Sequence, residues 1–412
     1  MRARQVPNSL RSVARSLMIR ALPAVGFLLV FWFSLEAKAL EIRQTRWGYD
    51  GRVLPAHFNL FSVLVENDRG QPFDGELRLE ETRGIANRVG APYVQKVYLA
   101  PNTSRWVQFI PFITSESNWT LRWGRKSSDE VSIDGAPFGG PAQVFLVDPT
   151  GLSQGQIKLK TFPADLFPTS VVTTDALHAV VLDHLPKWEP TRREAFLDWL
   201  RRGGTVHVLR DSNGPIAFEG ELEILNGGTG AKRIGAGKVV QHERMRHEVD
   251  DVSLASMEFP VPELKKGDNI RIYAFDSTVL QNLAQMAKPE IAWWLIYLLT
   301  VAYIVVVGPA HYRWGRKLDY RLSIGGFLGI VGLFSIAFSV VGRRGIGEVQ
   351  VANSVSIARA LGEGRFDVMQ WVNAFVTDGD YYRLTHRAES KAAINVYSTA
   401  AEIDAVNGQI HS

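Results

Sequence analysis

The chain of 412 residues contains no cysteine. This absence excludes disulfide bonds, thiolate zinc sites, iron–sulfur clusters and every catalytic cysteine. A chain without thiols also cannot mispair in an oxidising compartment outside the cytoplasm. We expect no cofactor and no metal site in this protein.

A surplus of positive charge is also missing outside the N-terminus. The whole chain has a formal net charge of +4, but residues 1–39 hold six basic residues against one acidic residue. Subtracting their balance of +5 leaves about −1 for the remaining residues. Such a balance gives no reason to expect nucleic acid as a partner. The length predicts two or three domains.

The N-terminal segment has the features of a secretory signal peptide. An arginine-rich start precedes the apolar run ALPAVGFLLVFWFSL, and Ala37-Lys38-Ala39 fits the small-x-small rule for cleavage. We expect residues 1–39 to be removed. The alternative is an uncleaved anchor, for which the run is short.

Two charge-free apolar runs, residues 291–310 and 322–341, are each long enough to cross a bilayer. The loop between them, residues 311–321, carries four basic residues against Asp319 alone. The positive-inside rule therefore places this loop in the cytoplasm and the flanking parts outside. The expected location is the bacterial inner membrane, with the soluble domains extracytoplasmic and the lipid bilayer as a partner. Two buried helices of a soluble protein are the alternative.

Residues 40–140 alternate between apolar and polar side chains in short segments separated by turns. This spacing is typical of an immunoglobulin-like β-sandwich. Four tryptophans in this region, Trp47, Trp106, Trp119 and Trp123, allow two interpretations. They form either a platform on which a sugar stacks or, as tryptophans in a sandwich more often do, part of the core.

Residues 141–287 have a different period. The runs AQVFLVD, ALHAVVLDHL and TVHVLRD are typical of buried strands, and EPTRREAFLDWLRRGG is an amphipathic helix with Pro190 in its first turn. Strand, helix and strand at this spacing predict a flavodoxin-like α/β domain. GKVVQHERM and NIRIYAF are interpreted as further strands.

The tail, residues 342–412, contains the strand-like runs EVQVANSVSIARALGEG and AAINVYSTA. We expect a short β-rich extracytoplasmic tail that buries little by itself. It either packs on the outer domains or belongs to a fuller domain.

Three segments carry a resemblance to a known group of proteins. They are VVLDHLPKWEPTRREAFLDWLRRGGTVHVL, the strand start GAGKVV, and YIVVVGPAHYRWGRK at the end of the first apolar run. The chain resembles uncharacterised bacterial membrane-anchored proteins that combine a β-sandwich, a class I glutamine-amidotransferase-like domain and C-terminal transmembrane helices. The resemblance implies this architecture for most of the chain and no particular activity.

The catalytic features of true amidotransferases are missing from the matching positions. Those enzymes need G-x-C-x-G at the strand-to-helix elbow and a downstream His-x-Glu. The corresponding region here reads LRDSNG, in which Ser212 is the one hydroxyl available, and SNG is also an ordinary turn. His242 and His247 in QHERMRHE are five residues apart, which does not place them on one face of a helix or strand.

Asp183 and His184 end a predicted buried strand and Asp211 ends the next. Because ligands of open α/β sheets bind at the carboxyl ends of strands, these three side chains are the other candidate site. Solvation of a loop and capping of the following helix are the simpler explanation of the same residues.

Two hypotheses about function follow. The favoured one is a non-catalytic binding or scaffold component of the bacterial envelope, with other envelope proteins as partners. The alternative is an envelope hydrolase or amidase that uses Ser212 or the cleft of Asp183, His184 and Asp211. A third and weaker interpretation is a receptor that binds a glycan or solute through the tryptophans.

Overall fold

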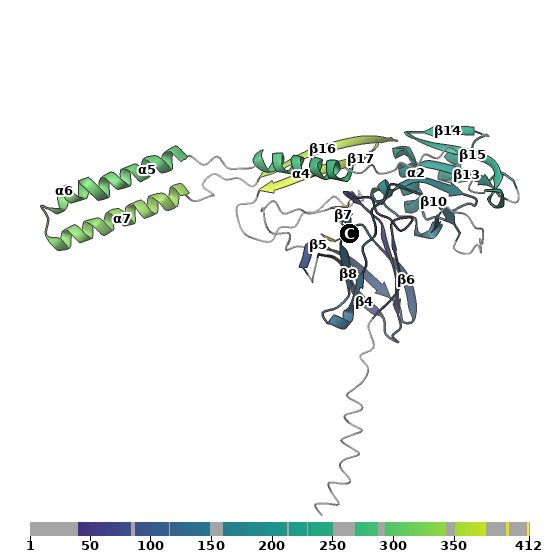
Figure 1. The fold of residues 1–412 in the computed structure, drawn as a ribbon, viewed down its shortest axis with the longest axis horizontal. Coiled ribbons are helices and arrows are strands. Elements are labelled where there is room, and N and C mark those ends of the chain that lie inside the picture. The colour runs from purple at the N-terminus through teal and green to yellow at the C-terminus, as the bar shows by residue number, and fades with distance from the viewer. Residues whose placement is uncertain are drawn as a thin grey trace, which may run out of the picture.

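The computed structural model describes the following residues, shown in Figure 1: 40–83, 87–114, 116–148, 160–211, 214–228, 230–249, 268–286, 293–342, 351–375, 393–394 and 410–411. The expected signal peptide lies outside these ranges. The described chain combines mixed sheets with helices, two of which are apolar and follow the α/β part. This composition is compatible with the α/β plus all-β fold class that the sequence predicts.

Two sheets near the N-terminus enclose one apolar core. The smaller sheet has three strands in the order β1 (Glu41–Trp47), β3 (Phe61–Asn67) and β6 (Thr103–Phe109). The larger sheet has five strands in the order β18 (Ile410–His411), β5 (Asn87–Leu99), β4 (Phe73–Arg83), β8 (Asn118–Arg122) and β9 (Glu130–Ile133). A separate pair joins β2 (His57–Phe58) to β7 (Phe112–Ile113). Because side chains alternate along a strand, Phe61, Val63 and Val65 all enter the core and are fully buried.

The second part is built on a six-stranded sheet. Its order is β11 (Lys160–Pro163), β10 (Ala142–Val147), β12 (Leu177–Leu182), β13 (Thr205–Arg210), β15 (Gly237–Met245), β14 (Gly230–Ile234). All neighbours are parallel except β14 and β15, which form a hairpin through Gly235 and Ala236. Short 3-10 helices complete the described elements: η1 (Ser127–Asp129), η2 (Ala164–Leu166), η3 (Val171–Ala176), η4 (Gly220–Leu225) and η5 (Arg246–Glu248).

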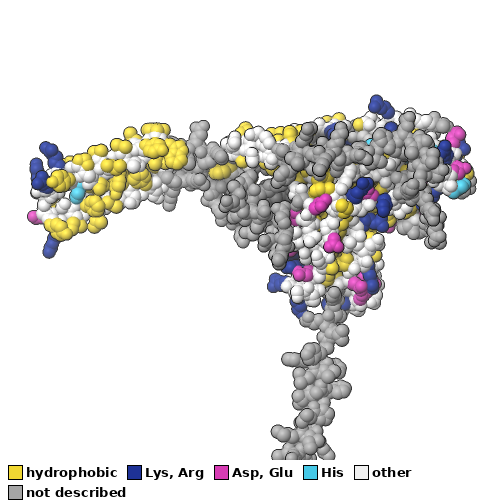
Figure 2. Space-filling model, in the orientation of Figure 1, with side chains coloured by type: hydrophobic (Ala, Val, Ile, Leu, Met, Phe, Trp, Pro, Cys, Tyr) yellow, Lys and Arg dark blue, Asp and Glu magenta, His cyan; other side chains and the backbone are white. Residues whose placement is uncertain are grey.

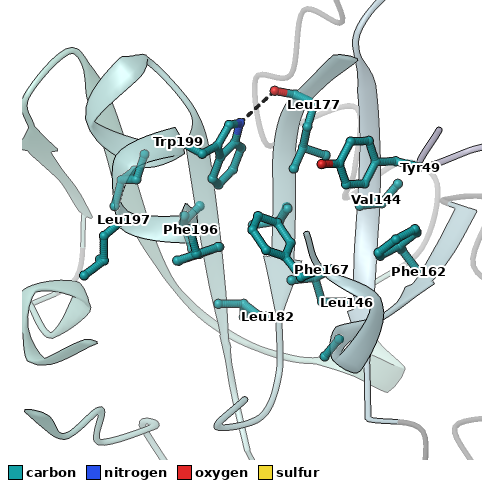
Figure 3. Packing of buried hydrophobic residues seen from close by; sticks show 14 of the residues in the cluster. Tyr49, Val144, Leu146, Phe162, Phe167, Leu177, Leu182, Phe196, Leu197 and Trp199 are labelled. Carbon is teal, nitrogen blue, oxygen red and sulfur yellow. Dashed lines mark hydrogen bonds between the residues drawn. The ribbon is translucent and has the colours of Figure 1, made fainter. Parts of the chain in front are cut away.

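Helix α2 (Pro190–Arg202) connects β12 to β13 and covers one face of this sheet. It begins with Pro190, whose fixed φ suits a first turn, and ends at Gly203 with a φ of 130°. Its buried side chains include Phe196, which packs against Phe167 in the cluster of Figure 3. The indole of Trp199 donates a hydrogen bond to the carbonyl of Leu177 at 2.8 Å. The amphipathic helix predicted from the sequence is therefore present at this place.

The two parts share a core. Tyr49, Leu54 and Leu60 come from the N-terminal part but belong to the apolar cluster of the six-stranded sheet. The Tyr49 ring lies 5.0 Å from the Phe162 ring, and both are drawn in Figure 3. The Gln108 side chain donates a hydrogen bond to the carbonyl of Leu166 at 2.7 Å. Burial of apolar surface thus holds the two parts together.

Two apolar helical stretches form an antiparallel pair that extends away from the other elements in Figure 1. The first contains α5 (Trp293–Val305), the π-helical turn η6 (Val306–Ala310) and α6 (His311–Gly315), and the second is α7 (Tyr320–Gly342). Both are long and apolar enough to cross a membrane, and 0% and 6% of their most apolar windows are buried. Pro309 cannot donate a backbone hydrogen bond, which accounts for the wide turn.

Two details differ from the sequence prediction. The first apolar helix continues through His311–Gly315, which the sequence assigned to the loop. NIRIYAF does not form a strand but lies in α4 (Asp268–Met286). The strand prediction was wrong because NIRIYAF alternates locally, whereas the following residues, TVLQNLAQM, propagate a helix.

Most of the described tail is an antiparallel ribbon of β16 (Val351–Gly362) and β17 (Arg365–Phe375), and its last described residues form β18, which pairs with β5 in the larger N-terminal sheet. Trp371 of β17 lies against α4, where its indole donates a hydrogen bond to Asp276 at 3.0 Å and its ring meets Phe275. Most of AAINVYSTA lies outside the described residues.

The tip of this ribbon is bound to α2 by ion pairs. Arg365 lies 2.7 Å from Glu194 and 3.0 Å from Asp198. Two further pairs have the arginine on α2 and the carboxylate on the ribbon: Arg201 lies 2.7 Å from Glu363, and Arg202 lies 2.9 Å from Asp367. We call these seven residues the α2–ribbon cluster: Glu194, Asp198, Arg201, Arg202, Glu363, Arg365 and Asp367. The chain that follows the apolar helices is therefore attached to the chain that precedes them.

Candidate functional site

The carboxyl ends of the parallel strands bring three polar side chains together. The Asp183 carboxylate lies 2.9 Å from Nδ1 of His184 and 3.3 Å from Nη1 of Arg246. Asp183 and His184 follow β12, while Arg246 follows β15, two strands away in the sheet. The sequence predicted the first two as a candidate site but did not indicate the arginine.

Arg246 has two contacts that fix its position. Its guanidinium stands over the Phe145 ring at 4.3 Å and at the same time pairs with Asp183. All three charged or titratable side chains are largely buried, with 16–20% of each side chain exposed. An ion pair screened from water in this way, with a stacked arginine, is stronger than one on the open surface.

The histidine is held in an orientation that acid–base chemistry uses. A carboxylate on Nδ1 fixes the imidazole and leaves Nε2 directed away from it. Nε2 of His184 is buried and has no hydrogen-bond partner among the described residues. The same carboxylate is occupied by Arg246, so its charge serves a structural ion pair as well.

The other predicted site residues are placed only in part. Asp211 follows β13 at the same edge of the sheet, and its backbone exchanges hydrogen bonds of 2.9 Å with Gly214. Ser212 lies outside the described residues. Within the ranges that the structure describes, no group of three His, Asp or Glu side chains converges in a way that could hold a metal ion.

A histidine pair, which the sequence analysis missed, links the buried His207 of β13 to the half-buried His242 of β15. Nδ1 of His207 lies 2.8 Å from Nε2 of His242, and the rings stack with centroids 5.1 Å apart. Burial, together with the neighbouring His242 and Lys238, lowers the pKa of His207 to about 2. Burial also lowers the pKa of His242. Both rings are therefore neutral at pH 7, and one donates its N–H to the other.

The tryptophan platform is not formed. Trp47 and Trp119 are 8% and 2% exposed and contact each other in the core, with ring centroids 5.6 Å apart. Trp123 packs against this same core and Trp106 against the other one. Two rings inside one core and two packed against different cores cannot stack together on one sugar, so the platform of four tryptophans was wrong.

Comparisons with known proteins leave the family open. No protein-family model matches the chain, and no curated protein matches it. Among the solved structures that match is a cycloisomaltooligosaccharide glucanotransferase from Paenibacillus sp. complexed with cycloisomaltoheptaose. It is 8% identical with a TM-score of 0.21, and the match covers 41% of this chain and 28% of that one. A likeness at this level supports no inference about the fold or function.

The histidine pair predicts loss of stability in acid. Because the folded pKa values lie below the ordinary value near 6.5, the unfolded chain binds protons that the folded chain does not. The stabilisation is complete above pH 6.5 and falls as the pH is lowered toward the folded pKa values. For one such proton the free energy of unfolding falls by about 1.4 kcal/mol per pH unit, or roughly 2 kcal/mol between pH 6.5 and pH 5.

Denaturant unfolding of the purified chain between pH 7.5 and pH 5 measures this slope. The double variant His207→Gln, His242→Gln is expected to flatten it, whereas the exposed His247→Gln is expected to leave it unchanged. Equal slopes in the wild type and the double variant would contradict the assignment.

Proposed function

We propose that this chain is a membrane-anchored envelope protein whose folded mass lies outside the cytoplasm and which acts as a non-catalytic binding or scaffold component. In this proposal residues 40–140 form an immunoglobulin-like β-sandwich and residues 141–287 form a flavodoxin-like domain of the glutamine-amidotransferase-like type. The two apolar helices anchor these domains in the bacterial inner membrane. The proposed partners are the lipid bilayer and other envelope proteins.

The observation that carries the proposal is the α2–ribbon cluster. It joins residues before the apolar helices directly to residues after them, for example Arg202 to Asp367. If both helices cross the bilayer, these residues must lie on the same side of it. A hairpin with a short loop, here between Gly315 and Tyr320, meets this requirement.

The charges of the hairpin support its orientation. Four basic residues lie at the closed end of the hairpin, where Figure 2 shows dark blue atoms beyond a largely hydrophobic surface. These are Arg313, Arg316, Lys317 and Arg321. Basic residues in a short loop are retained in the cytoplasm, so the folded domains would face the opposite side.

The state of the sheet edge supports a binding role over catalysis. In amidotransferases of this fold the elbow after the corresponding strand presents a nucleophile to a histidine. Among the residues described at this edge, those that converge are Asp183, His184 and Arg246, and the carboxylate is already paired with the arginine. The shared core around Tyr49 meanwhile holds the two folded parts together as one body that can present a continuous surface.

The absence of cysteine makes the placement directly testable. We expect Glu221→Cys and Gln370→Cys to react with a membrane-impermeant maleimide in cells whose outer membrane has been permeabilised. Lys317→Cys, in the loop of the hairpin, is expected to react only after detergent is added. The proposed placement would be overturned if only one of the first two variants reacted before detergent was added, or if Lys317→Cys reacted before detergent was added.

The hydrolase remains a second candidate because of one contact. Nδ1 of His184 is held by the Asp183 carboxylate while Nε2 is without a partner among the described residues, as in a base that awaits a hydroxyl. If Ser212 is an activated nucleophile, a fluorophosphonate probe will label it, and His184→Gln will abolish the labelling. For a scaffold we expect labelling of Ser212 no stronger in the wild type than in His184→Gln.

A further inference from the structure

In the part of the chain that the structure describes, strand β16 is an edge strand with one side unpaired. Its one strand neighbour among those residues is β17, while α2 and α4 also contact it, and α4 packs mainly against β17, with Phe275 on Trp371. Nine of the ten residues from Val351 to Ala360 are exposed, on both faces of the strand. Exposure on both faces together with an unpaired edge leaves a row of backbone N–H and C=O groups available to another strand.

The open edge lacks the features that normally prevent strand addition. Residues 351–358, VANSVSIA, contain no charged residue and no proline. The charges of the ribbon lie at its tip, on Arg359, Glu363, Arg365 and Asp367, and the last three bind α2. The free half exposes Val355 and Ile357 by 45% and 55%. Native proteins usually protect a long edge with lysine or proline, so an unprotected one indicates an interface.

The edge is complementary to itself. In antiparallel pairing of two copies about Ser354, Val351 faces Ile357 of the other copy and Asn353 faces Val355. The paired residues, 351–357, are all uncharged, so no like charges meet and the Arg359 side chains lie beyond the paired segment. A two-fold axis of this kind is the usual symmetry of a dimer.

Helix α7 presents a second unused surface close by in the chain. Its aromatic contacts with the first apolar stretch are made by Phe327, Phe334 and Phe338. At about 100° per residue, Gly325, Gly329 and Gly332 lie roughly 140–200° around the helix from Phe327, on the opposite side. A Cβ added at any of these three glycines would meet no atom within 4 Å. Small residues four apart on an open face permit close contact with a second membrane helix.

We propose that two copies of this chain form a dimer through antiparallel pairing of their β16 edges, with the glycine faces of their α7 helices in contact. Two copies anchored in one membrane have the same orientation relative to it, which raises the frequency of productive encounters. The β16 contact stands independently of the scaffold function proposed above. The membrane placement is used only for the α7 contact.

Single-cysteine crosslinking in native membranes tests the pairing. In the proposed dimer the two Ser354 positions face each other with Cα atoms about 4.5–5.5 Å apart, within the range of a disulfide. The full-length Ser354→Cys variant is therefore expected to form a disulfide-linked dimer under mild oxidation. The matched control is Gln370→Cys on β17, which is also exposed but is separated from its copy by three strand spacings, or more than about 14 Å, and it is expected to remain monomeric.

A second variant separates pairing from random collision. Ser354→Lys places two ammonium groups opposite each other at the two-fold axis, and light scattering of the detergent-solubilised chain is expected to show a monomer. Ser354→Thr is expected to keep the dimer. The proposal would be overturned by equal crosslinking at positions 354 and 370, or by a wild type that is monomeric. It would also be overturned if the Ser354→Cys variant stayed monomeric and did not react with maleimide because another segment of the chain covers the strand. The topology labelling depends on Glu221→Cys and Lys317→Cys, which take no part in the pairing test, so failure of the membrane placement is recognised separately.

Discussion

Burial of the aromatic face of α2 against the six-stranded sheet is the contact on which the rest of the arrangement depends. Phe196 and Trp199 enter a cluster with Phe167 and Trp188, and both indoles donate hydrogen bonds to backbone carbonyls. Removal of one such ring from a core costs about 3–5 kcal/mol. The core that α2 closes also contains Tyr49, so the same burial holds the N-terminal part in place.

The opposite face of α2 explains how the membrane helices relate to the folded parts. This face is lined by charges of both signs, and the ribbon tip supplies the complementary set. Burial raises the pKa of Asp198, while the Arg365 guanidinium favours its charged form. Because such groups are partly withdrawn from water, removal of one partner leaves an uncompensated charge and costs more than loss of an exposed pair. One amphipathic helix thus connects the sheet, the N-terminal part and the tail.

The elements that the sequence predicted correctly are those whose apolar pattern lies within one short segment of the chain. The β12–α2–β13 unit follows from a buried run, an amphipathic period and a glycine stop, and the two apolar helices follow from length and composition. The segment NIRIYAF was predicted as a strand because apolar and polar residues alternate over a few positions. It lies instead in helix α4, where its Phe275 packs against Trp371 of the ribbon. The tryptophans could not be assigned from spacing, since alternation shows which residues share a face but not which face is buried.

The candidate site was predicted in part for the same reason. Asp183 and His184 are adjacent in sequence, so their proximity required no knowledge of the sheet. Arg246 and the His207–His242 pair depend on β15 lying next to β13 and on the register shift after Val208. No periodicity within a single strand carries that information.

The most direct test of this arrangement is the distance between α2 and the ribbon tip in the membrane-bound protein. Cysteines that replace Arg201 and Glu363, whose side chains lie 2.7 Å apart, can be treated with a short bifunctional thiol reagent before cleavage of the chain between them. The two fragments should remain linked, and a pair at Glu221 and Glu363 should not. Fragments that separate equally in both variants would show that the tail does not contact α2. The conclusion that the chain before and after the apolar helices lies on one side of the membrane would then be contradicted.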